Sequence, residues 1–259
     1  WVLLNGNQTA LMFVYYLITR WKELGKINGK EYIVKTIVTT ETIKTIAERN
    51  GVEMYDVYTG FKWIANVMRE NEGKKNYIGG GEESYGFLCE DFVRDKDAVS
   101  ACVILAEIAA WAKDQGLSLY QLLQKIYVEY GFSKEKGISV VKKGKSGAEE
   151  IEAMMKKFRE NPLTEIAGSK VTYFYDYSTL KGKDYAENET VTLDMPTTSN
   201  VLQYFTEDNT KVSIRPSGTE PKIKFYCEVH SKVKSIDELP EAEKAAEEKI
   251  NQIKASLGI

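Results

Sequence analysis

Short apolar runs alternate with amphipathic segments along the first half of the chain. A helix-spaced apolar pattern runs to Trp21 after the polar stretch 5–9, where Asn7 or Thr9 is expected to cap the helix. Three strand patterns and two amphipathic helices then follow in turn: strands at 32–38, 52–57 and 77–78, with helices at 41–49 and 61–69. The order strand, helix, strand, helix, strand predicts a parallel sheet with crossover helices.

The next helical segment, residues 98–114, is rich in Ala, Ile, Leu and Val. Asp95 or Asp97 is placed to cap its start. Apolar residues occur all round this helix, so the pattern predicts burial over most of its circumference. The stretch 116–118 breaks the helix, and a second helix is expected at 119–130.

The second half of the chain has a different composition and a different order of elements. Residues 133–146 are rich in Lys and Gly and are interpreted as a linker, with a strand at 138–141 that crosses it. Strands with turn signals then lie between two helices, which predicts an antiparallel sheet with helices on one side. The helices are expected at 148–159 and 240–257, and the strands at 171–177, 191–193, 201–205, 211–214 and 222–229.

These patterns predict an α/β domain, with a mixed or parallel sheet and crossover helices, followed by an α+β domain. We assign residues 1–30 to the end of a preceding domain and a connecting helix, 31–131 to the α/β domain, and 132–259 to the α+β domain. The chain opens on "WVLL" without a methionine. That opening resembles the middle of a strand, and we expect the chain to be a piece of a longer protein.

Composition narrows the class of partner. The chain has 259 residues, 43% hydrophobic and 28% charged, with a net charge of −3. Both signs of charge are mixed along it, which argues against nucleic acid or a membrane as the main partner, because such binders concentrate basic residues on one face. Three isolated cysteines favour a reducing, cytoplasmic compartment. The chain has a single histidine, His230, which argues against a metal site or a catalytic triad that depends on histidine.

The segment "RPSGTEP" at 215–221 has the chemistry of an anion cradle. Arginine offers a planar fork of donors to phosphate oxygens, the hydroxyls add donors, and glycine permits positive φ and close backbone approach. Taken alone, the segment is more typical of a rigid hairpin loop with an exposed arginine. The candidate phosphate-binding residues are Arg215, Ser217, Gly218 and Thr219, with Lys222 a weaker candidate just past the loop.

The segment "GEESYG" at 81–86 follows a predicted strand and a run of three glycines that lets the chain turn sharply. Its adjacent carboxylates could bind a metal, act as acid and base, or accept hydrogen bonds from sugar hydroxyls. A metal site would need more oxygen ligands in register. Hydroxyl recognition requires an acceptor beside a donor, as in Glu82 and Ser84. An acidic surface turn is the alternative for this loop alone.

Together, "GEESYG", "TGFK" at 59–62, "FVRDKDA" at 92–98 and "RPSGTEP" resemble the alpha-D-phosphohexomutase superfamily. The closest resemblance is to its bacterial phosphoglucomutase/phosphomannomutase branch. The resemblance covers essentially the whole chain, in order. It implies the third and fourth of four domains around one cleft, in an enzyme that interconverts hexose 1-phosphate and hexose 6-phosphate.

The resemblance also implies roles for individual residues. Glu82 and Ser84 would bind sugar hydroxyls, Lys62 would lie near the substrate, and Tyr85 is a weaker candidate. Arg215, Ser217, Gly218 and Thr219 would hold the distal phosphate. The reaction would pass through a hexose 1,6-bisphosphate.

The family's phosphoserine segment and its Mg²⁺-binding aspartate loop have no counterpart in this sequence. We therefore expect no catalytic residue and no metal ligand here, a chain that is inactive alone, and missing N-terminal domains as its partner. Two alternatives stay open: a stand-alone phosphosugar-binding module, and a mutase for pentose or amino-sugar phosphates.

Overall fold

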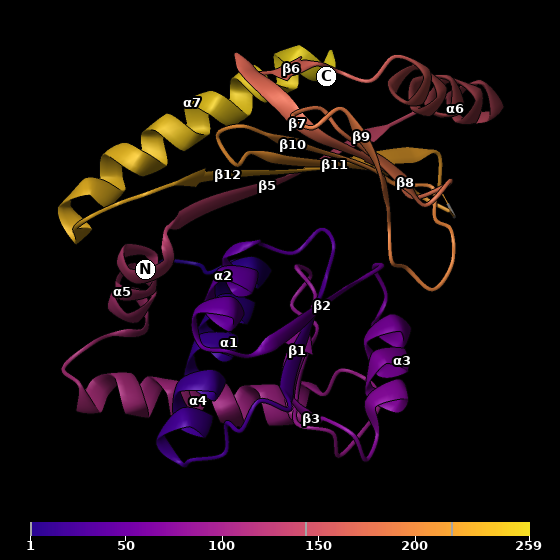
Figure 1. Ribbon diagram of the computed structural model, residues 1–259. Helices are drawn as coiled ribbons and strands as arrows, with labels where there is room; N and C mark the ends of the chain where they lie inside the picture. The colour runs from indigo at the N-terminus through magenta and orange to yellow at the C-terminus, as the bar shows by residue number, and fades with distance from the viewer. Residues whose placement is uncertain (1, 143, 219) are drawn as a thin grey trace. The chain divides into compact units, whose positions relative to one another are not determined.

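The computed structural model describes residues 2–142, 144–218 and 220–259 (Figure 1). The chain forms two compact units. The first comprises residues 1–132 with 232–239, and the second comprises 133–231 with 240–259. Each unit has its own sheet. The predicted class, an α/β domain followed by an α+β domain, is confirmed.

The first unit is built on a four-stranded sheet in the order β2-β1-β3-β4. Strands β1, β2 and β3 are parallel, whereas the short β4 runs antiparallel to β3. Figure 1 shows α3 on one face of this sheet and α1 and α2 on the other. The elements are α1 (Gly6–Glu23), β1 (Glu31–Thr36), α2 (Thr42–Arg49), β2 (Glu53–Val57), α3 (Phe61–Asn71), β3 (Asn76–Gly81), β4 (Phe87–Cys89), α4 (Ala98–Asp114), α5 (Leu119–Tyr130) and the short 3-10 helix η1 (Ile236–Glu238).

Amphipathic packing explains the core of this unit. One face of α3 packs its apolar residues on the sheet, in a cluster made of Tyr32, Val34, Val57, Phe61, Ile64, Met68, Tyr77 and Leu88. Strand β1 is buried along its whole length, as expected for a central parallel strand covered on both faces.

Helix α1 is capped by Asn5 and not by Asn7 or Thr9 as we expected. Asn5 and Gln8 form a reciprocal capping box, in which each side chain accepts from the other residue's backbone N–H. Asn7 instead accepts a hydrogen bond from the Thr40 N–H at 3.0 Å. Helix α1 also packs within the first unit, against β3, α2 and α5. The two compact units therefore have no boundary at residue 30, where the sequence analysis placed one.

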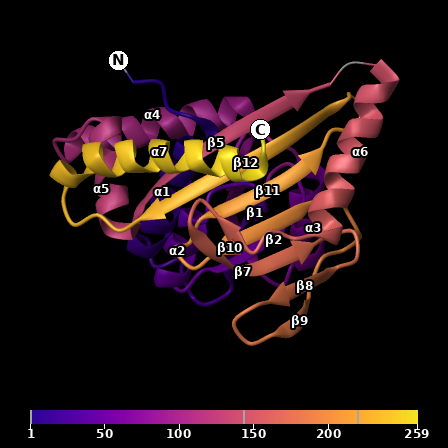
Figure 2. The same cartoon turned by 90° about the horizontal axis from the view of Figure 1, so that it is seen from above.

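The second unit has an antiparallel sheet in the order β5-β12-β11-β10-β7-β8-β9, with β6 paired to β7. Figures 1 and 2 show α6 and α7 on the same face of this sheet. The elements are β5 (Phe132–Val141), α6 (Gly144–Glu160), β6 (Glu165–Ile166), β7 (Ser169–Asp176), β8 (Lys181–Asp184), β9 (Glu189–Thr192), β10 (Leu202–Thr206), β11 (Lys211–Pro216), β12 (Lys222–Ser231) and α7 (Leu239–Leu257).

The linker expected at 133–146 is wrong, because most of it is strand β5 and the start of α6. Strand β5 lies at the edge of the sheet, and its second half is largely exposed. Exposed lysines are a common way to protect an edge strand from pairing with another chain. The same composition that suggested a linker is therefore that of an edge strand.

Candidate functional site

Three loops of the first unit meet at one edge of its sheet. Strands β1, β2 and β3 end together at Thr36, Val57 and Gly81, since Thr36 pairs with Val57 and Lys35 with Gly81. Ligands of parallel α/β sheets bind at the loops that follow such carboxyl ends. The segments "TGFK" and "GEESYG" follow β2 and β3, so the topology brings two of the four family motifs to this edge.

Glu82 fastens these two loops to each other. Its side chain is 9% exposed, and its Oε1 accepts a hydrogen bond from the Gly60 N–H at 2.8 Å. Its own N–H donates to the Gly86 carbonyl at 2.8 Å and closes the loop. Gly60 has φ of 111°, a backbone conformation that favours glycine. Glu82 is thus a structural link within the site, with one oxygen already engaged.

The glycine run 79–81 does not form the sharp turn that we expected. These residues belong to strand β3 and are buried. A Cβ at Gly80 would lie 2.3 Å from the Val34 carbonyl oxygen, and one at Gly81 would lie 2.6 Å from the Gly86 oxygen. The glycines therefore allow close backbone approach, and the turn itself is made by the residues after them.

The other sugar-site candidates, Ser84, Lys62 and Tyr85, are exposed. Tyr85 has φ of 71°, and its hydroxyl donates to the Leu4 carbonyl at 3.1 Å. Lys62 lies in the first turn of α3, with its ammonium 4.9 Å from the centre of the Trp63 ring. All three are accessible to a ligand at this edge of the sheet.

The motif "FVRDKDA" also reaches these loops, through Lys96. The Lys96 ammonium lies 5.8 Å from the centre of the Phe61 ring, and its Cδ would lie 3.0 Å from a Cβ at Gly86. Three of the motifs on which the resemblance rests, widely separated in sequence, are therefore neighbours within the first unit.

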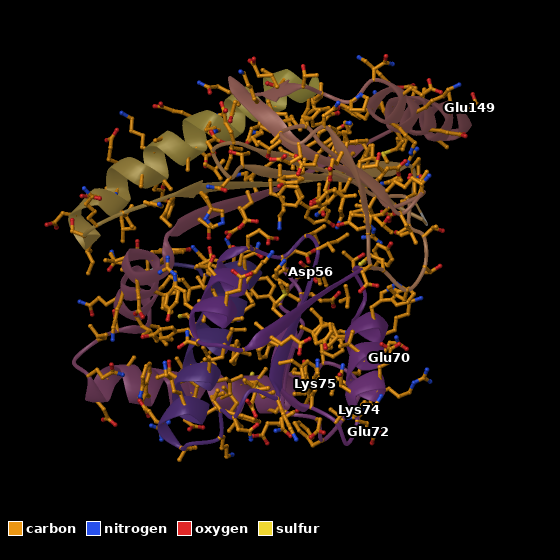
Figure 3. The ribbon with its side chains drawn as sticks, viewed as in Figure 1. Asp56, Glu70, Glu72, Lys74, Lys75 and Glu149 are labelled. Carbon is orange, nitrogen blue, oxygen red and sulfur yellow. The ribbon has the colours of Figure 1, made fainter. Side chains whose placement is uncertain are left out.

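A buried lysine at the same edge was missed by the sequence analysis. Lys35 has no exposed surface, and its ammonium lies 2.6 Å from Asp56 Oδ1, 2.9 Å from Glu41 Oε1 and 3.5 Å from the Thr39 carbonyl. Figure 3 labels Asp56 at this end of the sheet. The available signal was a lysine inside the otherwise apolar strand "YIVKT", since a buried ammonium requires paired charges.

Next to this lysine, hydroxyl and carboxylate groups join the β1 end to the "GEESYG" loop. The Thr36 hydroxyl is 2.7 Å from the Thr39 hydroxyl and 3.4 Å from Glu83 Oε2. Two buried threonines and a half-buried glutamate thus make a polar floor beside Glu82. Such groups can accept from and donate to hydroxyl groups of a ligand.

A polar cavity of about 760 Å³ lies at the opposite edge of this sheet and has lysines among its lining residues. Figure 3 shows Lys74 and Lys75 at that end. Lys75 is paired with Glu53 and the Tyr55 hydroxyl, and Lys74 donates to the Glu70 carbonyl at 2.9 Å. Lysines at the C-terminal end of a helix interact favourably with its exposed carbonyls and its dipole. Lys74 and Lys75 therefore have a structural role at the end of α3, and we do not take this cavity as the candidate functional site.

In the second unit, the segment "RPSGTEP" is the connection of a hairpin. Strands β11 and β12 pair antiparallel, with Arg215 opposite Lys224 and Pro216 opposite Ile223. Ser217 N–H donates to the Lys222 carbonyl at 2.7 Å, and the Ser217 hydroxyl accepts from the Glu220 N–H at 3.4 Å. The predicted alternation is confirmed, because Ile223 and Phe225 are buried while Lys222 and Lys224 are half-buried.

Gly218 and Lys222 have local environments that the sequence analysis did not predict. Gly218 does not adopt positive φ, and a Cβ there would meet no atom within 4 Å. An anion needs open space of this kind to reach the backbone N–H groups of the turn. Lys222 donates to Glu220 Oε2 at 2.7 Å, and this contact holds the pKa of the Glu220 carboxyl below its usual value. Thr219 lies outside the described residues.

Two further searches bear on the chemistry. In the described parts of the chain, no three His, Cys, Asp or Glu side chains cluster so as to hold a metal ion. Among the helices of the described residues, none is both long and apolar enough to cross a membrane.

Comparison with known proteins agrees with this two-unit arrangement. Residues 5–130 match the family description "Phosphoglucomutase/phosphomannomutase, alpha/beta/alpha domain III", and residues 139–246 match the C-terminal domain of the same family. The fold and its motifs thus define two consecutive domains of an alpha-D-phosphohexomutase. The chain belongs to the phosphoglucomutase/phosphomannomutase family.

Named relatives include two staphylococcal phosphoglucomutases. That of Staphylococcus aureus is 38% identical over 222 residues, which is 86% of this chain and 39% of the relative. That of Staphylococcus haemolyticus is 34% identical over 226 residues, or 87% of this chain and 40% of the relative. The chain therefore spans about two fifths of the length of the relatives it matches.

Solved structures share the fold. Parafusin, a phosphoglucomutase from Paramecium, has a TM-score of 0.58 at 17% identity and covers 100% of this chain and 43% of its own. A putative phosphomannomutase from Thermus thermophilus has a TM-score of 0.56 at 18% identity, covering 94% of this chain and 41% of its own.

Proposed function

We propose that this chain recognises the substrate of a hexose phosphate mutase, most closely a phosphoglucomutase, and that it is inactive without the family's N-terminal domains. The observation that carries the proposal is the match of both domains to one mutase family, with the "GEESYG" loop in the first and the "RPSGTEP" hairpin in the second. The staphylococcal phosphoglucomutases favour glucose phosphates as the substrate class.

The "GEESYG" loop would bind the hydroxyl groups of the sugar. Since Glu82 Oε1 already accepts from Gly60, a sugar hydroxyl would donate to Oε2, with Ser84 beside it as donor or acceptor. Lys62, exposed at the start of α3, would add positive charge near the ligand. Lys35 would act indirectly, by holding Asp56 and Glu41 in place at the end of the sheet.

The hairpin would bind the phosphate that does not react. Arg215 supplies a planar pair of donors, and the open space over Gly218 lets backbone N–H groups approach the phosphate oxygens. Ser217 and Thr219 would add hydroxyl donors. Lys222 would contribute only after it leaves Glu220, so its share of the binding free energy should be smaller.

The chemical step belongs to groups outside this chain in the proposal. Mg²⁺, which the family uses, and a phosphoserine would come from the N-terminal domains. The residues here would orient a hexose phosphate so that a phosphoryl group can be exchanged at either end, through a hexose 1,6-bisphosphate. Positioning of this kind can account for a large part of a catalytic barrier.

The test is a calorimetric titration of the chain with glucose 1-phosphate and glucose 6-phosphate. Both should bind, and Arg215→Ala should weaken that binding by roughly 2 kcal/mol, about thirtyfold, while the chain remains folded. The matched control is Lys170→Ala, an exposed lysine elsewhere in the same unit. Mutase activity of the chain alone, or sugar phosphate affinity that is unchanged in Arg215→Ala, would contradict the proposal.

A further inference from the structure

Helix α4 is built for burial over its first half. No charged residue occurs between Ala98 and Ala106, and its apolar residues are distributed round the whole helix. Helices of this kind are normally enclosed by other elements, whereas surface helices carry charged residues on the solvent side. Helix α7 shows the usual pattern, with Ala246 and Ile250 buried and Lys244 and Glu248 exposed.

The structure encloses only one side of α4. Ile108 and Ala112 are its buried residues among those described, so the burial predicted for most of its circumference is wrong for this chain. Val99 is 74% exposed and Val103 is 62% exposed. With the exposed Cys102, Ala106 and Ala110, they form what we call the α4 outer face. Their spacing of three and four residues places them on one side of the helix.

The orientation of the helix is fixed from its inner side. Trp111 packs edge-on against Tyr16, with ring centres 5.3 Å apart, and Glu107 accepts a hydrogen bond from the Tyr16 hydroxyl at 2.5 Å. Asp97 caps the helix by accepting from the Ser100 N–H at 2.8 Å. A rotation that buried Val99 and Val103 would break these contacts. The outer face is therefore left exposed by those elements of the first unit that the structure describes.

We propose that the α4 outer face docks the domain that precedes domain III in the longer members of this family. The chain spans about two fifths of its staphylococcal relatives, and its first match is to a domain numbered III, so those relatives carry substantial polypeptide ahead of the matched region. This inference rests on the proposed function, in which those domains are the partner. It goes beyond that function by naming the surface that receives them.

Cys102 provides a direct probe of this surface. It is the exposed cysteine of the chain, whereas Cys89 and Cys227 are buried. The partner probe is the part of the Staphylococcus aureus phosphoglucomutase that precedes its match to this chain, either fused ahead of the chain or added as a separate polypeptide. The measurement is the rate at which a thiol reagent modifies Cys102, with and without that partner.

We expect the fused partner to slow modification of Cys102 roughly tenfold or more, because thiol reactivity follows access. Val103→Lys should restore the fast rate in the fusion. Val141→Lys is the matched control, since Val141 is 65% exposed on β5 and should not change the rate. Absence of reaction at Cys89 and Cys227 shows that both units remain folded.

Equal Cys102 rates with and without the partner would overturn the proposal. So would protection that appears in the chain alone and grows with its concentration, because the occupant would then be a second copy. Glucose phosphate binding by the fusion is measured separately. A fusion that binds sugar phosphate but leaves Cys102 reactive disproves the docking alone, and one that protects Cys102 without binding disproves only the proposed function.

Discussion

The two candidate loops are held in place in opposite ways. The "GEESYG" loop depends on contacts with distant segments: Glu82 with Gly60, Glu83 with Thr36, and the Glu83 backbone against Gly6. The "RPSGTEP" hairpin has hydrogen bonds among its own residues, with Ser217 bonded to Lys222 and Lys222 to Glu220, and one to a distant segment, from the Lys142 N–H to the Pro221 carbonyl at 2.9 Å. One loop is part of the packing of its unit, and the other is a local connection at the end of two strands.

This difference predicts a difference in how the two loops tolerate substitution. A change in the first loop should alter folding stability and ligand binding together, because the same atoms serve both. A change in the hairpin should alter binding with little effect on stability. The four tryptophans of the chain all lie within the first 132 residues, so their fluorescence reports unfolding of the first unit.

The largest effect is expected from Gly6→Ala. A Cβ at Gly6 would lie 2.0 Å from the Glu83 carbonyl oxygen, so the helix start or the loop must move. We expect the free energy of unfolding of the first unit to fall by about 3 kcal/mol, measured by urea titration of tryptophan fluorescence.

Gly218→Ala is the counterpart in the hairpin. Its Cβ meets no atom within 4 Å and its φ is not positive, so the free energy of unfolding should change by less than ~0.5 kcal/mol. Circular dichroism, which reports both units, is the measurement. Equal stability losses in the two glycine variants would remove the distinction between the loops.

Glu82→Ala should have the next largest effect. It leaves the N–H of the half-buried Gly60 without its acceptor, which costs about 1–2 kcal/mol of the first unit's stability. Glu82→Gln retains an amide oxygen and should recover much of that loss. Ser84→Ala, at an exposed position of the same loop, is the control and should unfold at the wild-type urea concentration. If Glu82→Ala were as stable as Ser84→Ala, Glu82 would not be a structural link.

Arg215→Ala should lower phosphate affinity by roughly 2 kcal/mol, about thirtyfold, without changing stability. Lys222→Ala should lower it by less, because Lys222 must first give up its contact with Glu220. Titration with inorganic phosphate compares the two variants. A larger loss for Lys222→Ala would mean that the lysine, and not the arginine, is the principal phosphate ligand.

The smallest effect concerns pH and the second unit. Burial lowers the pKa of His230, but the hydrogen bond from His230 to Glu228 and the charges of Glu228 and Glu135 outweigh it, so the pKa is raised above 6.5. A raised folded-state pKa gives stability that is fully present below the unfolded value and is lost as pH rises through the folded one.

We therefore expect the second unit to lose stability modestly as pH rises from about 6.5. The stability of the second unit at each pH is measured by hydrogen exchange of the β12 amides, after correction for the pH dependence of the intrinsic exchange rate. In His230→Gln the slope with pH should flatten. A slope that is the same in the variant would assign the pH dependence to other groups.

Local patterns in the sequence were sufficient for the order of elements and the fold class. Periodicity and capping residues predicted α4 with a cap at Asp95 or Asp97, of which the structure has Asp97, and alternation predicted the faces of β12. The hairpin at 215–221 could also be predicted, because a hairpin connection is formed by residues adjacent in sequence.

Features that depend on contacts between distant segments could not be predicted from the sequence. The acceptor role of Glu82 toward Gly60, the partners of Lys35, and the reason for the glycines at 79–81 all arise where separate loops and strands meet. The edge position of β5 and the open side of α4 depend on what packs beside them. The sequence by itself determined which segments are mainly helix, strand or hairpin turn, because local periodicity and turn chemistry act over a few residues. Only the tertiary structure decided which polar groups are paired and which apolar face is left exposed, because pairing and burial depend on segments far apart in the chain.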